Sequence, residues 1–188
     1  MEETERYEYH LKIPKERIAV LIGKEGEVKK SIEEETKTEL DIDSKEGEVA
    51  VSGTDGLDML TAREIIRAIS RGFNPDIAKL LLKPDYGLEI ISTTDYAKTA
   101  NDAIRLKGRV IGREGKSRKL IENHTECYIS VYGKTLSIIG EIEKLAIARK
   151  AIELLLRGSQ HSKVFQWLER QRRQMRQSDF MKSVSSKE

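Results

Sequence analysis

An internal repeat limits what this chain can fold into more than any other feature of its sequence. Residues 22–26 (IGKEG) recur as residues 111–115 (IGREG), at an offset of 89. Further matches follow in the same order at offsets of 89, 87 and 86, and the drift falls in expected loops, which tolerate changes of length. The matched pairs include Ile32 with Ile121, Thr36 with Thr125, Leu40 with Ile129, Ile42 with Val131, Val49 with Leu136, Val51 with Ile138 and Gly53 with Gly140. The 188 residues therefore contain two copies of one domain.

The spacing of hydrophobic residues and the positions of proline and glycine predict the order of elements within a copy. Pro14 can open a helix at its first turn, the glycines of GKEG interrupt that helix, and Gly72 ends the last one. The predicted elements of the first copy are a strand at residues 7–13, helices at 14–22 and 27–37, strands at 39–43 and 49–52, and a helix at 57–71. The second copy has the same order, with a longer first helix that Thr94 or Asp95 is expected to cap. Each copy thus reads β-α-α-β-β-α.

This order predicts an α+β fold in which each copy forms a three-stranded antiparallel sheet backed by helices. We expect one domain at residues 1–83, a second at 84–158, and a basic C-terminal helix with a disordered end at 159–188. The first domain should carry an added short helix after Asn74 and Pro75. The tail helix should run from near Ser162 to about Gln177, and Trp167 should anchor it by packing.

Charge is distributed unevenly along the chain. Residues 1–85 hold 14 Lys and Arg against 20 Asp and Glu, residues 86–158 hold 13 against 9, and residues 159–188 hold 7 against 3. A polyanion should therefore prefer the second copy and the tail. The mean hydropathy of −0.54 and the lack of a long apolar run predict a cytoplasmic protein without a membrane partner.

A β-α-α-β-β-α domain with GxxG between its first two helices resembles the type I K-homology (KH) domain. Two such motifs in matching context make the resemblance specific, and it covers nearly all of residues 7–158. It implies single-stranded RNA binding, because the glycines allow close approach of a backbone and the next helix offers free N–H groups to phosphates. In KH domains such a loop clamps about four nucleotides.

The second copy carries more positive charge around its motif and is expected to be the principal RNA reader. Its candidate residues are Arg109, Val110, Ile111, Gly112, Arg113, Glu114, Gly115, Lys116, Arg118 and Lys119. Secondary candidates are Gly23, Lys24, Glu25 and Gly26 of the first loop and Arg170, Arg172, Arg173 and Arg176 of the tail. In other KH domains an apolar residue commonly follows the last glycine by three positions. Here Lys29 and Arg118 stand there, which predicts a groove directed more toward phosphates.

These basic residues, the tandem copies, the extended helix before Gly108 and the basic tail resemble a narrower family. It comprises the archaeal relatives of the partner-of-Nob-one (Dim-two) proteins, and the related Krr-like factors share the architecture. The resemblance implies a non-catalytic factor that holds the 3′ region of small-subunit pre-rRNA. It also implies ribosome-assembly partners, among them the endonuclease that makes the final 3′ cut. We expect a monomer.

Other chemistries fit the sequence less well. Residues 115–117 (GKS) resemble the end of a Walker A loop, but Val110 stands where that motif needs its first glycine. The histidines His10, His124 and His161 and the lone Cys127 have no metal-ligand spacing, so neither a metal nor another cofactor is expected. An enzyme is therefore disfavoured. The main alternative is a protein-interaction scaffold that uses the acidic first domain and binds RNA only secondarily.

Overall fold

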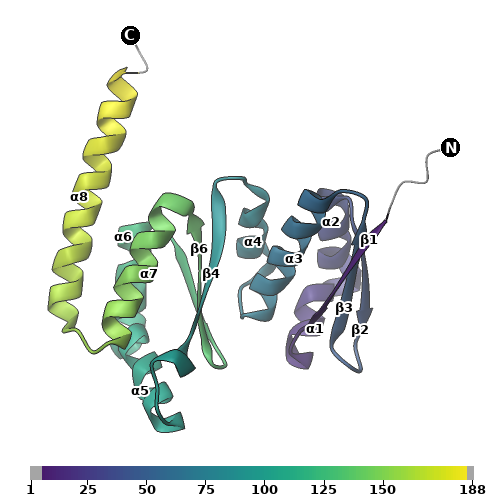
Figure 1. Ribbon diagram of the computed structural model, residues 1–188, viewed down its shortest axis with the longest axis horizontal. Coiled ribbons are helices and arrows are strands. Elements are labelled where there is room, and N and C mark those ends of the chain that lie inside the picture. The colour runs from purple at the N-terminus through teal and green to yellow at the C-terminus, as the bar shows by residue number, and fades with distance from the viewer. Residues whose placement is uncertain (1–5, 186–188) are drawn as a thin grey trace. The chain divides into compact units, whose positions relative to one another are not determined.

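The computed structural model describes residues 6–185 and has the predicted β-α-α-β-β-α order in each repeat (Figure 1). The chain divides into two compact units, residues 1–88 and residues 89–188. Each repeat has one three-stranded antiparallel sheet, with strand orders β1-β3-β2 and β4-β6-β5. The predicted α+β class, with tandem domains and a C-terminal helix, is confirmed.

The first repeat follows its sequence signals closely. Asp55 accepts hydrogen bonds from two backbone N–H groups and so caps the third helix, and Asn74 caps the added short helix that begins at Pro75. The elements are β1 (Tyr7–Lys12), α1 (Lys15–Ile22), a 3₁₀ turn (Lys24–Gly26), α2 (Glu27–Thr36), β2 (Glu39–Asp43), β3 (Glu48–Gly53), α3 (Gly56–Ser70), α4 (Pro75–Ala78) and a 3₁₀ turn (Lys79–Leu82).

The second repeat departs from its prediction at the start of the first helix. The hydroxyl of Thr99, and not Thr94 or Asp95, caps this helix by accepting from the N–H of Asp102 at 3.2 Å. Residues 93–95 instead form their own 3₁₀ turn, which Thr93 ties to the Lys134 carbonyl. The elements are β4 (Tyr86–Ser92), this turn (Thr93–Asp95), α5 (Ala100–Ile111), a 3₁₀ turn (Arg113–Gly115), α6 (Lys116–Thr125), β5 (Tyr128–Tyr132), β6 (Thr135–Glu141), α7 (Ile142–Leu156) and α8 (His161–Ser185).

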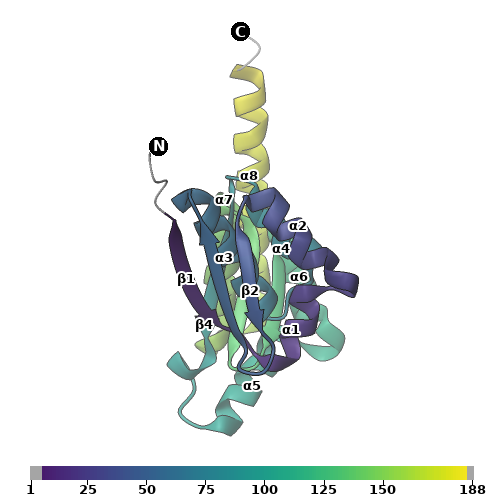
Figure 2. The same cartoon turned by 90° about the vertical axis from the view of Figure 1, so that its right-hand side faces the viewer.

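The residues that match between the repeats form the two cores. On the central strands, Val49 and Val51 of β3 and Leu136 and Ile138 of β6 are all fully buried. Figure 2 shows the first sheet, in which β3 lies between β1 and β2. Because side chains alternate along a strand, residues two apart share the face that the helices cover. The repeat in the sequence is thus mainly a repeat of core positions.

The edge strand β1 of the first unit is less covered than its alternating pattern suggests. Tyr9 pairs with Val51, and directly paired residues share a face of the sheet, so Tyr9 lies on the helix-covered side. Nevertheless Tyr7 is 51% exposed and Tyr9 42% exposed. Helix α3 reaches this edge through Arg63, whose guanidinium lies 5.2 Å from the centre of the Tyr9 ring. This edge of the first unit therefore leaves aromatic surface open.

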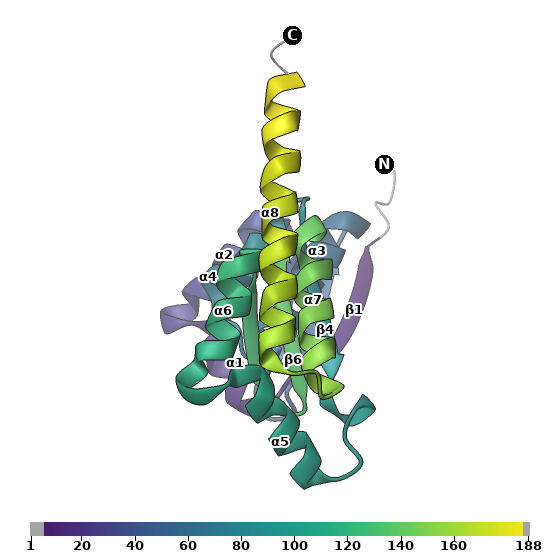
Figure 3. The same cartoon turned by 90° about the vertical axis from the view of Figure 1, so that its left-hand side faces the viewer.

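Helix α8 packs along α6 and α7 (Figure 3). Val164 and Leu168 are each 1% exposed, so the first turns of the helix complete the core of the second unit. Trp167 packs partly buried against the same core, as expected of an anchor. The helix continues past the predicted end at Gln177 to Ser185, and residues 186–188 of the predicted disordered end lie outside the described residues. Among the described residues, no helix is both long and apolar enough to cross a membrane.

Gly140 on β6 provides a test of the core. A Cβ at this position would lie 2.4 Å from the Cys127 sulfur, so Gly140→Ala should destabilise the protein by about 1–3 kcal/mol through overpacking. Gly56→Ala is the matched control, because a Cβ there meets nothing within 4 Å, and it should change stability by less than about 0.5 kcal/mol. Urea unfolding followed by circular dichroism measures both. Equal stability of the two variants would contradict this packing.

Candidate RNA-binding site

The two GxxG loops have nearly the same backbone conformation. The first glycine has φ and ψ of 74° and 178° at Gly23 and of 73° and 174° at Gly112. The third residue, a glutamate in each loop, has a φ of 53° in both copies, and the last glycine is left-handed in both. Any difference in binding between the two loops must therefore come from their side chains.

The first glycine of each loop is required by a close contact as well as by its dihedral angles. A Cβ on Gly112 would lie 2.6 Å from the Cβ of Ser117, and one on Gly23 would lie 2.5 Å from Cγ2 of Val28. At the last glycine of each loop, Gly26 or Gly115, an added Cβ meets nothing within 4 Å. The first glycine thus closes the turn between two helices, while the last leaves open space in front of the next helix.

That open space faces a helix N-terminus that no side chain caps. Gly26 and Gly115 are the N-cap residues of α2 and α6 and carry no side-chain acceptor. The first N–H of each helix donates to a carbonyl of the loop, and the N–H groups that follow it have no partner within the helix. Such groups, together with the positive end of the helix dipole, favour an anion. Each loop therefore offers surroundings that suit an anionic group.

The two loops differ in charge. Residues 113–119 contain four basic side chains and one glutamate, whereas residues 24–30 contain three basic side chains and two glutamates. In the second loop Arg113, Lys116 and Lys119 are exposed. Lys116 pairs loosely with Glu114 at 3.3 Å, and Arg113 forms no ion pair with the described residues. Exposed cations of this kind set both the affinity for RNA and its dependence on salt.

Two of the residues predicted to contact RNA have a role in the fold. The guanidinium of Arg109 donates to the carbonyl oxygens of Leu155 and Ser159, at 3.0 and 2.5 Å, and so holds the end of α7. Its hydrogen-bonding groups thus serve the fold. Val110 is fully buried in the core, so its side chain is not available to RNA, while Ile111 beside it is partly exposed.

The basic residue three positions after each motif is paired within the fold. Arg118 lies 3.6 Å from Glu122, and Lys29 lies 3.8 Å from Glu33. The same glutamates also accept a hydrogen bond from the strand that follows. The backbone N–H of Ile129 donates to Glu122, and that of Leu40 donates to Glu33. These cations therefore help to join helix and strand, and their charge is partly neutralised. The groove directed toward phosphates, which Lys29 and Arg118 led us to expect, stays a prediction.

Comparison with known proteins matches this arrangement. Residues 87–173 match the family model for the second KH domain of PNO1, described as a eukaryotic type KH domain (KH domain type I), and residues 8–68 match the KH domain model. A KH domain-containing protein of Methanocaldococcus jannaschii is 51% identical over 174 residues, which cover 90% of this chain and 76% of that protein.

Two further relatives carry more specific names. A chain in the crystal structure of an a/eIF2α–aDim2p–rRNA complex from Pyrococcus horikoshii is 47% identical with a TM-score of 0.85, and the match covers 92% of this chain and 98% of that one. A pre-rRNA-processing protein PNO1 of Chaetomium thermophilum is 33% identical over 105 residues, 54% of this chain and 40% of that protein. The chain belongs to the Dim2p/PNO1 family of tandem KH proteins. This family is RNA-binding and non-enzymatic.

Two of the tail arginines, Arg172 and Arg176, lie at the end of α6 away from the GxxG loop of the second KH domain. Arg172 and Arg176 act on Glu126, which follows α6, and their charges help to lower the pKa of its carboxyl, although its hydrogen bond from Lys144 is the larger cause. Arg170, Arg173 and Arg176 are exposed, and Arg172 is partly buried. Arg172 and Arg176 therefore lie away from the loop and do not extend its basic surface.

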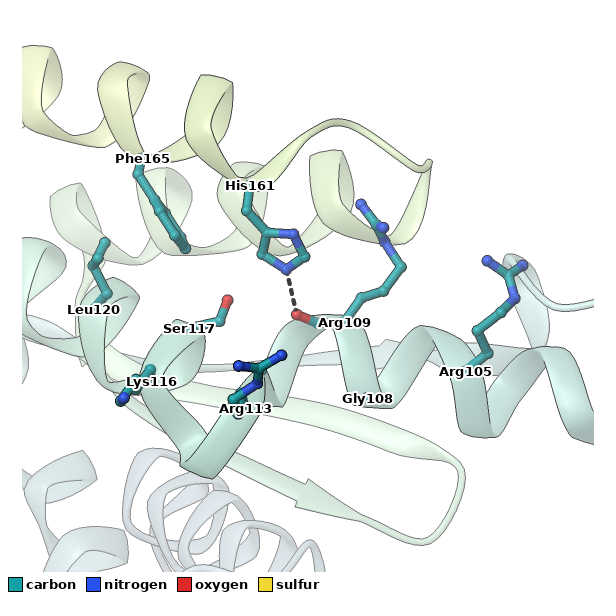
Figure 4. A pocket seen from close by; sticks show the side chains of 10 residues that line it. Arg105, Gly108, Arg109, Arg113, Lys116, Ser117, Leu120, His161 and Phe165 are labelled. Atoms are coloured by element: carbon teal, nitrogen blue, oxygen red, sulfur yellow. Dashed lines mark hydrogen bonds between the residues drawn. The ribbon is translucent and has the colours of Figure 1, made fainter.

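Several residues beside the second KH loop were missed by the sequence reasoning. Ser117, His161 and Phe165 line a pocket next to Arg113 (Figure 4). His161 and Phe165 reach the loop only because α8 packs beside it, and no local sequence pattern predicts this packing. Ser117 could have been found by comparing the repeats, because Val28 is its partner at the offset of 89.

The described residues contain no cluster of three or more side chains suited to a metal ion. Cys127 is 3% exposed, and burial raises the pKa of its thiol to about 11. It is therefore a core residue and not a nucleophile at neutral pH.

The two glycines of the second loop should respond differently to alanine. Gly112→Ala should cost about 3 kcal/mol or more, because a strained dihedral and a steric clash act together. Gly115→Ala should cost only about 1 kcal/mol, since the left-handed φ of 73° is its sole penalty. Denaturant midpoints of both variants test this order, and a larger loss for Gly115→Ala would contradict it.

The stability of the second KH domain should depend on pH through His124. Burial lowers the pKa of this histidine, the charge of Arg172 lowers it further, and Glu169 opposes both. The unfolded chain then takes up a proton before the folded one, so stability is greatest above about pH 6.5 and is lost as pH falls below it. Denaturant midpoints between pH 7.5 and 5.5 should fall more steeply for the wild type than for His124→Gln. Identical slopes would show that His124 does not contribute.

Proposed function

We propose that this protein is a single-stranded RNA-binding factor of small-subunit ribosome biogenesis that holds the 3′ region of the pre-rRNA, chiefly through its second KH domain. The observation that carries the proposal is the pair of loops with the same backbone and different charge. The loops share their geometry, and Arg113 and Lys119 have basic counterparts in the first loop. Lys116, however, stands where the first loop has Glu27, and this reversal of charge supports the second loop as the stronger phosphate site. In this role the loop of Gly112–Gly115 positions the RNA backbone, and β5 presents groups to base edges.

The names of the relatives support this role. The structure from Pyrococcus horikoshii holds rRNA together with a/eIF2α and aDim2p, and the relative from Chaetomium thermophilum is a pre-rRNA-processing protein. A non-catalytic factor bound at the rRNA 3′ end would work beside the nuclease that produces that end. The first loop, residues 23–26, and the tail arginines would then be secondary contacts for a longer RNA.

A protein-interaction role for the first KH domain is the second candidate. The uncovered edge of its sheet lines a hollow of about 280 Å³, with Tyr7, Tyr9 and Leu60 each more than 40% exposed. Grouped aromatic and aliphatic surface of this kind is typical of protein contacts. The acidic balance of residues 1–85 also disfavours RNA there. The two roles are compatible, since they use different domains.

The experiment that tests the proposal compares matched variants of the two loops. Arg113→Asp with Glu114→Asp, and Lys24→Asp with Glu25→Asp, make the same change of charge in loops of the same backbone. The first pair should weaken binding to a single-stranded RNA from the 3′ end of small-subunit rRNA by about tenfold or more, and should flatten its salt dependence. The second pair should change the affinity less than about threefold.

Binding is measured by fluorescence anisotropy at two salt concentrations, with circular dichroism to confirm that each variant is folded. A larger loss from the first-loop pair would assign the RNA to the first domain. Equal binding by the wild type and both variants would place the RNA away from the loops. Failure of the wild type to bind would favour the scaffold role.

A further inference from the structure

A pocket of about 500 Å³ opens on the side of the second GxxG loop that faces α8 (Figure 4). It is lined by Arg105, Gly108, Arg109, Gly112, Arg113, Lys116, Ser117, Leu120, His161 and Phe165. The contributing positions of α5 recur every three or four residues and so share one face of that helix. Lys107 lies on another face and donates to the Gly133 carbonyl in the turn between β5 and β6, at 2.9 Å. The pocket is thus separate from the surface between α5 and the sheet.

Ser117 marks the polar end of this pocket. It is the second residue of α6 and is 4% exposed, yet its hydroxyl has no hydrogen-bond partner in the part of the chain that the structure describes. In Figure 4 the hydroxyl oxygen points into the space below His161 and Phe165. Burying a hydroxyl without a partner is unfavourable, and such groups are uncommon in folded proteins. The hydroxyl is therefore available to a ligand that enters the pocket.

The surroundings of Ser117 select an anion. The uncapped N-terminus of α6 lies directly beside it, and Arg113 and Lys116 flank it with exposed positive charge. Arg105 adds a third cation, which is only loosely held by Asp102 at 3.3 Å and whose side chain is 64% exposed. No acidic residue lines the pocket. A phosphate would gain a hydroxyl donor, backbone donors and positive charge at one place.

The opposite wall of the pocket is aromatic. The rings of His161 and Phe165 meet edge to face with 5.8 Å between their centres, and both residues are only partly exposed. His161 is fixed, because its Nε2–H donates to the carbonyl oxygen of Arg109 at 2.8 Å. Leu120 completes this apolar side. The aromatic wall suits the base of a nucleotide, and the cationic side of the pocket suits its phosphate.

We propose that this pocket holds one further nucleotide of the bound RNA, with its phosphate at Ser117 and Arg113 and its base against Phe165 and His161. The proposal rests on RNA binding by the second KH domain, and it adds one position to the four nucleotides that a GxxG loop clamps. The RNA chain would turn at the GxxG loop and enter the pocket beside α8. Helix α8 thereby becomes part of the RNA site through its first turns, and not through its distant arginines.

The first repeat supplies the substitution that tests this role. Val28 occupies the position of Ser117 against a loop of the same conformation, so the fold accepts valine there. Ser117→Val removes the hydroxyl while leaving the loop intact. Arg105→Gln removes a cation from the pocket, and Arg157→Gln is its matched control, because it removes an equal charge from an exposed residue outside the pocket.

The experiment measures the affinity of single-stranded RNAs from the rRNA 3′ region, lengthened one nucleotide at a time from four and at either end. For the wild type, one added nucleotide should raise the affinity roughly tenfold, as expected for one base held against an aromatic ring. Ser117→Val and Phe165→Leu should abolish this gain without changing the affinity of the four-nucleotide RNA. Arg105→Gln should reduce the gain, and Arg157→Gln should not.

Each other outcome overturns the proposal. Four-nucleotide binding without a gain from any added nucleotide would leave the loop as the whole site. A gain that survives in Ser117→Val and Phe165→Leu would place the added nucleotide elsewhere. Saturable binding of adenosine monophosphate by the wild type, without a gain in the RNA series, would make the pocket a site for free nucleotides. Absence of all RNA binding would overturn the proposed function as well.

Discussion

In each repeat, the start of the second helix packs against the first glycine of the GxxG motif so closely that no side chain fits between them. The gap is closed by Val28 in the first copy and by Ser117 in the second, within 3 Å of where a Cβ would stand. This contact fixes the angle between the two helices and the path of the loop that joins them. It also exposes the N-terminus of the second helix, because the last glycine carries no side chain to cover it. The proposed phosphate site therefore depends on how the two helices pack.

Because packing fixes the loop, the side chains around it can differ between the copies without changing its shape. The first copy has two glutamates among three lysines at residues 24–30, whereas the second has one glutamate among four basic residues at residues 113–119. Some cations are nevertheless used for the fold. Arg17 and Arg109 occupy different positions of the first helix, yet each donates to carbonyl groups at and beyond the end of the last helix. Counting basic residues thus overstates the charge that is free for RNA.

The sequence predicted what depends on repetition and period, and it missed what depends on tertiary packing. The element order, the buried strand residues and the two loops follow from matches between the copies, such as Val51 with Ile138. The cap at Thr99 was missed because the chain inserts a 3₁₀ turn between strand and helix. The internal role of Arg109 was missed because its partners, the carbonyls of Leu155 and Ser159, are more than 40 residues away. Charge alone gives no indication of such a partner.

The tail shows how one helix can serve both the fold and the site. Its buried residues Val164 and Leu168 complete the core, and this packing fixes the rotation of the helix. Residues at positions 161 and 165 then fall one turn apart on the side that meets the loop. Arg172 lies two turns further on, where its charge reaches His124 instead. The hydrophobic stripe of α8 therefore decides which of its polar and aromatic residues can approach the GxxG loop. The number of arginines in its sequence does not decide this.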